Sequence, residues 1–380
     1  MPSNVAEKQP AASLKREPSS PQLPERQRQL SRWDPRSWTL VTWIGVGVIT
    51  IVVVVVAVVG GVLGARATAY PNYYKLDYKL KDTYAGSTFF DEFDYFTGYD
   101  PTHGFVHYVD SEGSKLHNLT KFTSPAPPNS LSKDGTVILR VDAEDKNATT
   151  GRRSVRITSR KTYDTGLFIF DVVHSPYGCA TWPAIWLTDT YNWPDHGEID
   201  VVESVNMGDT GNQMTLHTTD GCKIGKHRRR KQTGEVLAYD CHNATNYNVG
   251  CGVTGPTYSF GEAFNANGGG VYALELRSEG IRVWLFNRTS TPSDITEQKP
   301  DPSTWGEALA DFPNLECDIG SHFGNLSIIA NIGLCGDWAG QKTIFGSNPM
   351  CTGTCSDYVA TRAQDFEQAY WEFGGFWVYQ

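Results

Sequence analysis

Several things are missing from this chain of 380 residues. No charged residue occurs from Ser37 to Ala65, and no cysteine occurs before Cys179, which confines any disulfides to the later part of the chain. Cys/His spacing of the zinc type and acidic loops of the EF-hand type are also absent, so we expect no metal and no cofactor. We find no internal repeat and no second globular region, which indicates one large domain.

The uncharged segment predicts a transmembrane helix over residues 39–64. It is rich in valine and isoleucine and exceeds the ~20 residues that a helix needs to cross a bilayer. A cleaved signal peptide usually has a shorter apolar region nearer the start of the chain, so we expect an uncleaved signal anchor. Cleavage near Ala65-Arg66-Ala67 is the alternative.

The residues before this segment are polar and basic. Residues 1–38 are rich in Pro, Gln and Ser and lack apolar periodicity, which predicts a disordered tail. They carry seven Lys/Arg, whereas only Arg66 follows the segment before Lys75. The positive-inside rule therefore predicts a cytosolic tail and an extracellular or lumenal domain, a single-pass type II membrane protein. We expect a stalk over residues 65–85 and a folded domain over residues 86–380.

Cysteines, glycosylation motifs and charge agree with that location. The eight cysteines could form up to four disulfides, with their pairing left open. Five N-glycosylation sequons lie in the same part of the chain, at Asn118, Asn147, Asn243, Asn287 and Asn325. The tail has a net charge of +3 (seven basic minus four acidic residues), so the remainder carries −12, given −9 overall. An acidic domain argues against nucleic acid and suits a neutral glycan.

The stretch Gly197-Glu-Ile-Asp-Val-Val-Glu-Ser204 sets three carboxylates into an apolar run. On a strand, Glu198 and Asp200 point to one face, and strict alternation would turn Glu203 to the other. A β-bulge after Asp200 inserts one extra residue and returns Glu203 to the acidic face. We therefore predict three carboxylates on one face of a bulged strand. The alternative is a strand whose acidic face is simply solvated.

The spacing of the two glutamates predicts a curved sheet. Glu198 and Glu203 are about four strand steps apart, or roughly 13 Å on a straight strand. The two carboxyl groups of a retaining glycosidase lie about 5–5.5 Å apart, so the strand must be concave for the glutamates to lean together. Such a row of carboxylates suits glycosidic bond cleavage by a nucleophile and a general acid.

Tryptophans surround this stretch. Aromatic rings stack on the apolar faces of sugar rings, so Trp182 and Trp193, beside prolines, and Trp338, in a glycine-flanked loop, are candidate sugar platforms. We expect Trp186, within a strand-like run, to pack in the core. His217 and Gln213 lie in the next alternating run. His217 could contact Asp200 or a sugar hydroxyl, or be a structural histidine, and Gln213 is a weaker candidate for sugar contact.

The chain resembles glycoside hydrolase family 16, in its fungal endo-1,3(4)-β-glucanase branch. The similarity extends from about Tyr78 to the C-terminus. The segments that carry it are Glu198–Glu203, Trp-Pro-Ala-Ile-Trp before it, Asn-Gln-Met-Thr-Leu-His after it, Phe89-Phe-Asp, Gly104-Phe-Val and Cys335-Gly-Asp-Trp. The resemblance implies a β-jelly-roll sandwich of the concanavalin A type with a concave cleft. It also implies Glu198 as nucleophile, Glu203 as acid/base and Asp200 as their electrostatic partner.

The rest of the domain reads as all-β. Short alternating runs lie over residues 136–141, 154–158, 166–173, 271–276, 281–286 and 326–332, and a turn at Ser278-Glu-Gly280 predicts a hairpin. We expect a monomeric, membrane-anchored retaining endo-glycosidase of β-1,3- or mixed β-1,3/1,4-glucan, for example of the cell wall. The alternatives are a glucan transglycosylase of the same fold, a hydrolase of another glycan, and a glucan-binding receptor that has lost catalysis.

Overall fold

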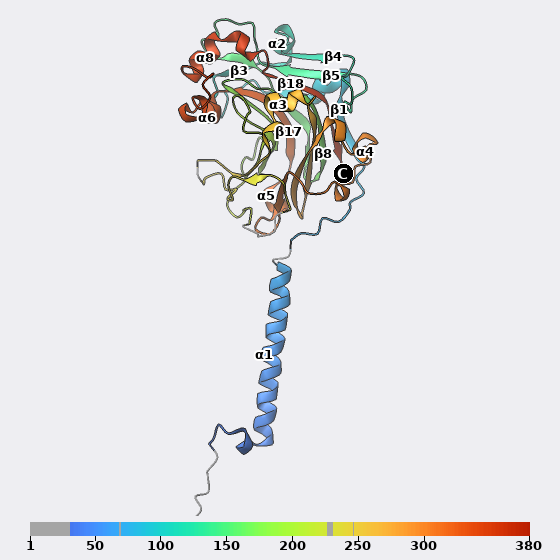
Figure 1. The fold of residues 1–380 in the computed structure, drawn as a ribbon, viewed down its shortest axis with the longest axis vertical. Coiled ribbons are helices and arrows are strands. Elements are labelled where there is room, and N and C mark those ends of the chain that lie inside the picture. The colour runs from blue at the N-terminus through green and yellow to red at the C-terminus, as the bar shows by residue number, and fades with distance from the viewer. Residues whose placement is uncertain (1–30, 68–69, 226–230, 246) are drawn as a thin grey trace, which may run out of the picture. The chain divides into compact units, whose positions relative to one another are not determined.

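A computed structural model describes residues 31–67, 70–225, 231–245 and 247–380. The chain forms two compact units, Met1–Ala67 and Thr68–Gln380. The first contains η1 (Pro35–Ser37) and the long helix α1 (Leu40–Ala67). Residues Leu40–Gly64 of α1 are long and apolar enough to span a membrane, as predicted (Figure 1). Residues 1–30 lie outside the described part, so the disorder of the tail stays a prediction.

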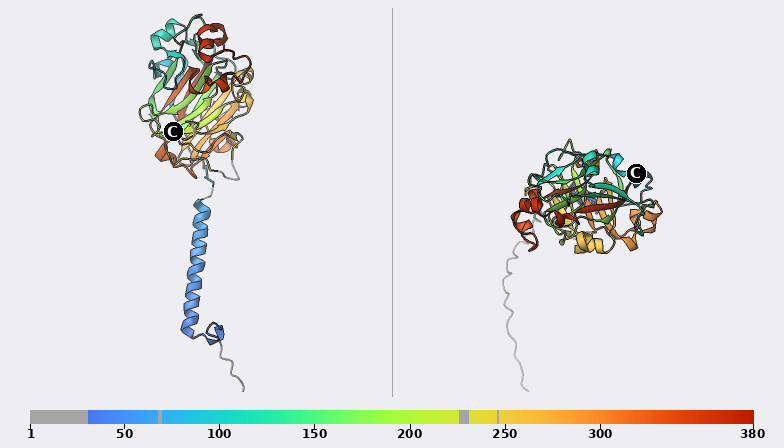
Figure 2. Two further views of the ribbon diagram at one scale, coloured as in Figure 1. Left: turned by 90° about the vertical axis from the view of Figure 1, so that its left-hand side faces the viewer. Right: turned by 90° about the horizontal axis from the view of Figure 1, so that it is seen from above.

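The second unit is a sandwich of two antiparallel sheets (Figures 1 and 2). We call the sheet that carries Glu198–Glu203 the motif sheet. Its strand order is β12 (Glu235–Val236), β13 (Cys251–Thr254), β11 (Gln213–His217), β10 (Glu198–Glu203), β9 (Thr181–Thr188), β17 (Leu326–Leu334), β7 (Arg156–Tyr163) and β2 (Phe93–Tyr95).

The second sheet, called the opposite sheet, contains the C-terminal strand near its centre. Its strand order is β16 (Ala310–Pro313), β15 (Gly280–Asn287), β14 (Gly270–Arg277), β8 (Gly166–His174), β18 (Tyr370–Tyr379), β5 (Thr136–Arg140) and β4 (Thr120–Thr123), with β1 (Leu80–Ala85) also paired to β18. The predicted hairpin is confirmed, because Arg277 of β14 pairs with Gly280 of β15.

Short elements connect the strands. A parallel pair is formed by β3 (Val106–Tyr108) and β6 (Arg152–Ser154). The helices of this unit are α2 (Ser111–Leu116), α3 (Gly261–Ala266), α4 (Ser293–Thr296), α5 (Ile319–His322), α6 (Gly336–Ala339), α7 (Lys342–Phe345) and α8 (Cys355–Thr361). The 3-10 helices are η2 (Gly86–Glu92), η3 (Thr257–Ser259), η4 (Arg288–Ser290), η5 (Pro302–Thr304) and η6 (Ala363–Phe366).

The core lies between the two sheets. Alternate residues of facing strands fill it, for example Phe168 and Phe170 of β8 against Ile185 and Leu187 of β9. A smaller cluster, which includes Trp284, covers the outer face of the opposite sheet. Burying apolar side chains on both faces of that sheet explains why its strands, such as β14, are buried throughout.

The predicted stalk is partly a component of the folded unit. The hydroxyls of Tyr70 and Tyr73 each donate a hydrogen bond to Asp311, at 2.7 Å, and Leu80–Ala85 extends the opposite sheet beside β18. The boundary predicted at residue 85 therefore lies inside the folded unit. Periodic apolar residues are scarce over residues 70–79, so periodicity does not predict this packing, which uses tyrosine hydroxyls and rings.

All eight cysteines form disulfides. The pairs are Cys179–Cys351, Cys222–Cys317, Cys241–Cys251 and Cys335–Cys355. Two of them join the α6–α8 region to the beginning of β9 and the end of β17. These cross-links restrict the loops at that end of the sandwich.

Candidate active site

The predicted bulge is present in β10. Asp200 pairs with Trp186 of β9, but the next pair along is Val202 with Ile185, so that Val201 is the extra residue. The register against β11 shifts at the same place, between Asp200 and Glu203. Val201 and Val202 are both fully buried in the core, whereas Glu198 and Glu203 are half-buried on the other face. The prediction of three carboxylates on one face of a bulged strand is confirmed.

Asn212 holds the bulge in place, a role that was not predicted from the sequence. A bulge leaves backbone groups without ladder partners, and buried groups of that kind require a substitute. The Asn212 side chain accepts a hydrogen bond from Glu203 N at 2.7 Å and donates one to Val201 O at 2.9 Å. Its own backbone N–H donates to Ser259 Oγ at 2.8 Å. This fully buried asparagine therefore fixes the direction of Glu203.

Each glutamate accepts a hydrogen bond from an indole. Trp193 Nε1 donates to Glu198 Oε2 at 2.6 Å, and Trp182 Nε1 donates to Glu203 Oε1 at 2.7 Å. Trp338 packs edge-on against Trp182, with ring centroids 5.8 Å apart. Of the three tryptophans predicted as sugar platforms, Trp182 and Trp193 thus contact the glutamates, and Trp338 packs on Trp182.

Burial gives the two glutamates unusual acidities. Burial and the nearby charge of Asp200 raise the pKa of Glu203 well above its usual range. The same two causes raise the pKa of Glu198 to about 7. Hydrogen bonds from the two indoles and the charge of His217 oppose both shifts. Two carboxyl groups of raised pKa on one face are suited to acid and base roles in a reaction near neutral pH.

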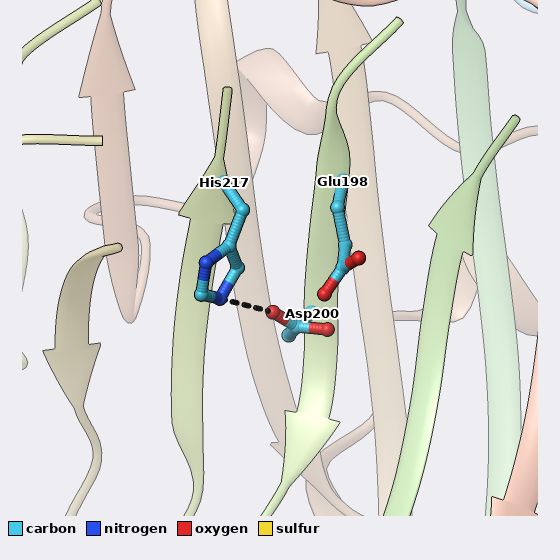
Figure 3. Close-up of side chains that lie close together, drawn as sticks. All are labelled: Glu198, Asp200 and His217. Atoms are coloured by element: carbon cyan, nitrogen blue, oxygen red, sulfur yellow. Dashed lines mark ion pairs between the residues drawn. The ribbon is translucent and has the colours of Figure 1, made fainter. Parts of the chain in front are cut away.

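His217 faces Asp200 from the neighbouring strand (Figure 3). Its Nε2 lies 3.4 Å from Asp200 Oδ2, and its Nδ1 is 3.0 Å from Asn248 Oδ1. Gly250 packs against the ring: its φ is +67°, and a Cβ there would lie 2.8 Å from His217 Cε1. Burial alone would lower the pKa of His217. The contact with Asp200 and the negative charges of Glu198, Asp200 and Glu203 instead raise this pKa to about 9. The imidazolium thus offsets part of the negative charge.

Glu198, Asp200 and His217 are also the one group of potential metal ligands among the described residues. One ligand atom from each lies within 4.8 Å of the others, and carboxylates with an imidazole suit a divalent cation. His217 Nε2 and Asp200 Oδ2 already form an ion pair with each other, so a bound cation would have to break that pair. The expectation that the protein uses no metal stays a prediction.

Of the remaining residues singled out from the sequence, Gln213 lies where a sugar contact is expected and Trp186 does not lie in the core. Gln213 pairs directly with Glu203 and is half-buried on the same face, as a sugar contact requires. Trp186 was expected in the core, and this is wrong: it pairs with Asp200, remains partly exposed and donates from Nε1 to Asn331 Oδ1 at 2.8 Å. The guanidinium of Arg156 lies 4.9 Å from its ring centroid. The apolar neighbours of Trp186 in sequence concealed this exposure.

Asp189 organises the loop that carries Trp193, a role that the sequence did not reveal. Its Oδ2 accepts hydrogen bonds from Asn192 Nδ2 at 2.8 Å and Asn325 Nδ2 at 2.9 Å and contacts His196 Nδ1 at 2.7 Å. Its Oδ1 accepts from the backbone N–H of Tyr191 at 3.0 Å. Asp189 is itself only 2% exposed. One carboxylate therefore fixes the loop on both sides of the tryptophan that contacts Glu198.

Comparison with known proteins places this geometry in a family. Residues 93–379 match the model of the XgeA-like, catalytic GH16 domain. A probable glycosidase of Schizosaccharomyces pombe is 45% identical over 314 residues, which are 82% of this chain and 71% of the relative. The endo-1,3(4)-β-glucanase xgeA of Emericella nidulans is 36% identical over 334 residues, covering 84% of this chain but only 50% of the relative.

Solved structures agree. Laminarinase 16A of Phanerochaete chrysosporium, bound to 6-O-glucosyl-laminaritriose, is 43% identical, with a TM-score of 0.74 over 80% of this chain and 100% of the laminarinase. An elongating family 16 β-1,3-glucosyltransferase is 38% identical, with a TM-score of 0.72 over the same shares of the two chains. The predicted jelly-roll sandwich is confirmed by these similarities.

Proposed function

The chain belongs to glycoside hydrolase family 16, and from this premise we propose that it is a retaining endo-β-glucanase of β-1,3- or mixed β-1,3/1,4-glucan. The observation that carries the proposal is the bulged strand that places two glutamates of raised pKa on one face. The names of relatives, laminarinase and endo-1,3(4)-β-glucanase, support the choice of substrate.

In the proposed first step, Glu203 is the general acid. Its raised pKa keeps the carboxyl protonated at working pH, so that it can donate a proton to the oxygen of the departing sugar. Glu198 attacks the anomeric carbon, the glycosidic bond breaks, and a covalent glycosyl-enzyme forms. The Trp193 N–H holds one oxygen of Glu198 and leaves the second available for attack.

In the second step, the glycosyl-enzyme is hydrolysed. Glu203, now ionised, takes a proton from a water molecule that attacks the anomeric carbon and releases Glu198. Asp200 and His217 act as electrostatic partners, because a cationic imidazole offsets the charge of two adjacent carboxylates. These groups interact strongly enough to titrate as a set, so observed pKa values belong to the cluster.

We assign substrate binding to the aromatic and polar side chains around the carboxylates. Sugar rings stack on Trp182, Trp193 and Trp338, and Gln213 hydrogen-bonds to hydroxyls at the same face. Trp193, which is 42% exposed, is the ring with the most accessible surface for stacking. His217 contacts Asp200, so its contribution to sugar binding is secondary.

We propose that the enzyme is held at a membrane with its catalytic unit outside the cytosol. The apolar helix α1, the basic residues before it and the four disulfides support a type II arrangement. A glucanase held in this way meets glucan of the cell wall. The enzyme needs no partner subunit in this scheme, and we expect a monomer.

A glucan transglycosylase is the second candidate function. The structural similarity to an elongating β-1,3-glucosyltransferase favours it, at nearly the same TM-score as the laminarinase. Both activities share the glycosyl-enzyme and differ only in whether water or a sugar hydroxyl attacks it. A receptor without catalysis is disfavoured, because all three carboxylates are present on one face.

Product analysis tests these proposals. The unit from Thr68 onward is incubated with laminarin and with mixed-linkage glucan, beside a Glu198→Gln control. Short reducing oligosaccharides that are absent from the control are the expected result, and the better substrate sets the linkage. Products longer than a supplied oligosaccharide indicate the transglycosylase. No turnover, with tight glucan binding by both proteins, contradicts both enzymatic functions.

A further inference from the structure

A cavity of about 250 Å³ opens beside the end of β15, remote in sequence from the carboxylates. Strand β16 pairs with Gly280–Val283 only, so the last residues of β15 lie beyond the end of that neighbour. The cavity is lined by Thr233, Tyr258, Phe286, Asn287, Trp305 and Glu307, among others. Its volume is below the range for drug-sized ligands, which suits one or two small rings.

The cavity wall has the chemistry of a sugar site. Trp305 stands edge-on to Trp284 and to Phe286, with centroids 5.3 Å apart in both pairs, and its N–H donates to Asp294 Oδ2 at 2.8 Å. These contacts hold the indole in place. Tyr258 of η3, which is distant from Trp305 in the sequence, also lines the cavity and is 49% exposed. Aromatic faces beside a carboxylate and a hydroxyl are the usual surroundings of a pyranose ring.

Asn287 is both a wall residue and the asparagine of a glycosylation sequon, Asn287-Arg288-Thr289. Asn287 is exposed, whereas Arg288 is buried and donates from Nη2 to Val172 O at 2.8 Å. The backbone of the sequon is therefore fixed, and its asparagine lies at the cavity. None of the other four sequon asparagines lines this cavity.

We propose that Asn287 carries an N-linked glycan whose first N-acetylglucosamine lies in this cavity. In the transfer, Asn287 Nδ2 loses a proton and bonds to the anomeric carbon of a lipid-diphosphate-linked oligosaccharide, and the lipid diphosphate leaves. A sugar attached at the wall is present at an effective concentration in the millimolar range or above, so it can occupy the cavity without a second molecule. The cavity therefore holds the protein's own glycan. The proposal rests on the placement of the domain outside the cytosol but not on its activity.

The rate of enzymatic deglycosylation tests the docking. The full chain is produced in a eukaryotic secretory host, and endoglycosidase H, which cuts between the first two N-acetylglucosamines, is added to native protein. Site-specific mass spectrometry follows Asn287 and, as a matched control, Asn147, which is also exposed and does not line this cavity. We expect cleavage at Asn287 to be about tenfold slower, which corresponds to about 1.4 kcal/mol of docking free energy, and equal rates after denaturation.

Substitutions in the cavity wall and at the sequons distinguish a docked glycan from one that is merely attached. Tyr258→Ala leaves the sequon intact and opens the cavity, so cleavage at Asn287 should accelerate toward the rate at Asn147 while glucan hydrolysis is unchanged. Asn287→Gln should lower the unfolding temperature by about 2–4 °C, whereas Asn147→Gln should not.

Three results overturn the proposal. Equal cleavage rates at the two asparagines in native protein show that the glycan is not docked. An unmodified Asn287 beside a modified Asn147 shows that the cavity does not hold this glycan, and glucan binding that depends on Tyr258 would then assign it to substrate. Absence of glycan at every sequon removes the proposed location of the domain as well.

Discussion

Both sheets contain acidic residues of low exposure, but those of the opposite sheet are paired with arginines, whereas those of the motif sheet share one histidine. Glu275 of β14 is 1% exposed, and its Oε2 accepts from Arg282 Nε at 2.9 Å while its Oε1 accepts from Tyr78 at 3.0 Å. Glu198 and Glu203 each accept one indole hydrogen bond and face one shared histidine.

Asp171 of the opposite sheet and Asp200 of the motif sheet differ in the same way, in the number of their partners. Asp171 of β8 accepts from Ser130 Oγ and Leu131 N, both at 2.7 Å, and is paired with Arg288. Asp200 Oδ2, in contrast, has no hydrogen bond of good geometry among the described residues and only His217 at 3.4 Å. Removing one partner of a fully paired buried charge destabilises a fold, whereas a carboxylate with few partners remains available for chemistry.

The largest expected effect comes from neutralising one acid in each sheet. Glu203→Gln should lower glucan hydrolysis about 10²–10⁴-fold through loss of the general acid, while the free energy of unfolding is maintained or raised. Glu275→Gln should destabilise by about 3–5 kcal/mol, because it leaves Arg282 and Arg277 without their buried anion, and should spare specific activity. Reducing-sugar release and urea denaturation of both variants measure the contrast.

Azide rescue serves as the control for the role of Glu203. Glu203→Ala, with substrates that have good leaving groups, should regain turnover in azide, because azide attacks the glycosyl-enzyme without a base. A folded Glu203→Ala protein with no rescue would count against the acid/base assignment. If Glu203→Gln unfolded as easily as Glu275→Gln, the distinction between the two sheets would fail.

Asn212 extends the comparison to uncharged groups. Asn212→Ala removes the bonds to Val201 O and Glu203 N and should cost about 1–3 kcal/mol of stability. Because Glu203 loses its direction, we also expect kcat to fall, by about 10²-fold. Steady-state kinetics with urea denaturation give both values.

Asn265 supplies the matched variant. Its side chain likewise accepts from the backbone N–H of Ser175 at 2.8 Å and donates to Ser175 O at 2.9 Å, away from the carboxylates. Asn265→Ala should lose a similar amount of stability and keep its kcat. Equal kinetic losses in the two variants would mean that Asn212 acts only through stability.

The loop held by Asp189 predicts a smaller effect. Asp189→Asn replaces an acceptor of several hydrogen bonds by an amide, which should loosen the loop and reduce kcat/KM about tenfold as Trp193 leaves Glu198. Asp142→Asn is the control, because Asp142 also caps a loop, accepting from Glu144 N at 2.8 Å and pairing with Arg153. An unaltered kcat/KM in Asp189→Asn would show that Trp193 is held by other contacts.

The smallest effect is a change in pH dependence on replacing His217. The folded-state pKa of about 9 lies above the ordinary 6.5, so the charged imidazole contributes stability that is fully present below pH 6.5 and is lost as pH rises through 9. His217→Gln should remove this slope from urea midpoints measured between pH 6 and 9. The charge of His217 also lowers the pKa of Glu198, so the acidic limb of kcat/KM should move to higher pH. An unmoved limb would separate His217 from the nucleophile.

The sequence alone was sufficient where the physical rule is local. Alternation and one extra residue predicted the bulge and the common face of Glu198, Asp200 and Glu203, because side-chain direction on a strand follows from position. The length and apolarity of residues 39–64 likewise predicted helix α1, since a membrane span is defined by composition. The strands around residues 136–140 and 166–174 followed from periodicity.

Only the tertiary structure decided which distant groups meet. Asn212, Asn248 and Asp189 carry no local signal, because an asparagine or aspartate in a loop is ordinary until a neighbouring strand supplies its partner. The pairing of eight cysteines and the packing of Tyr70 and Tyr73 on Asp311 also join segments far apart in the chain. The types and faces of the reacting groups were thus determined by sequence, while their protonation and orientation were set by burial and by contacts that exist only once both sheets have formed.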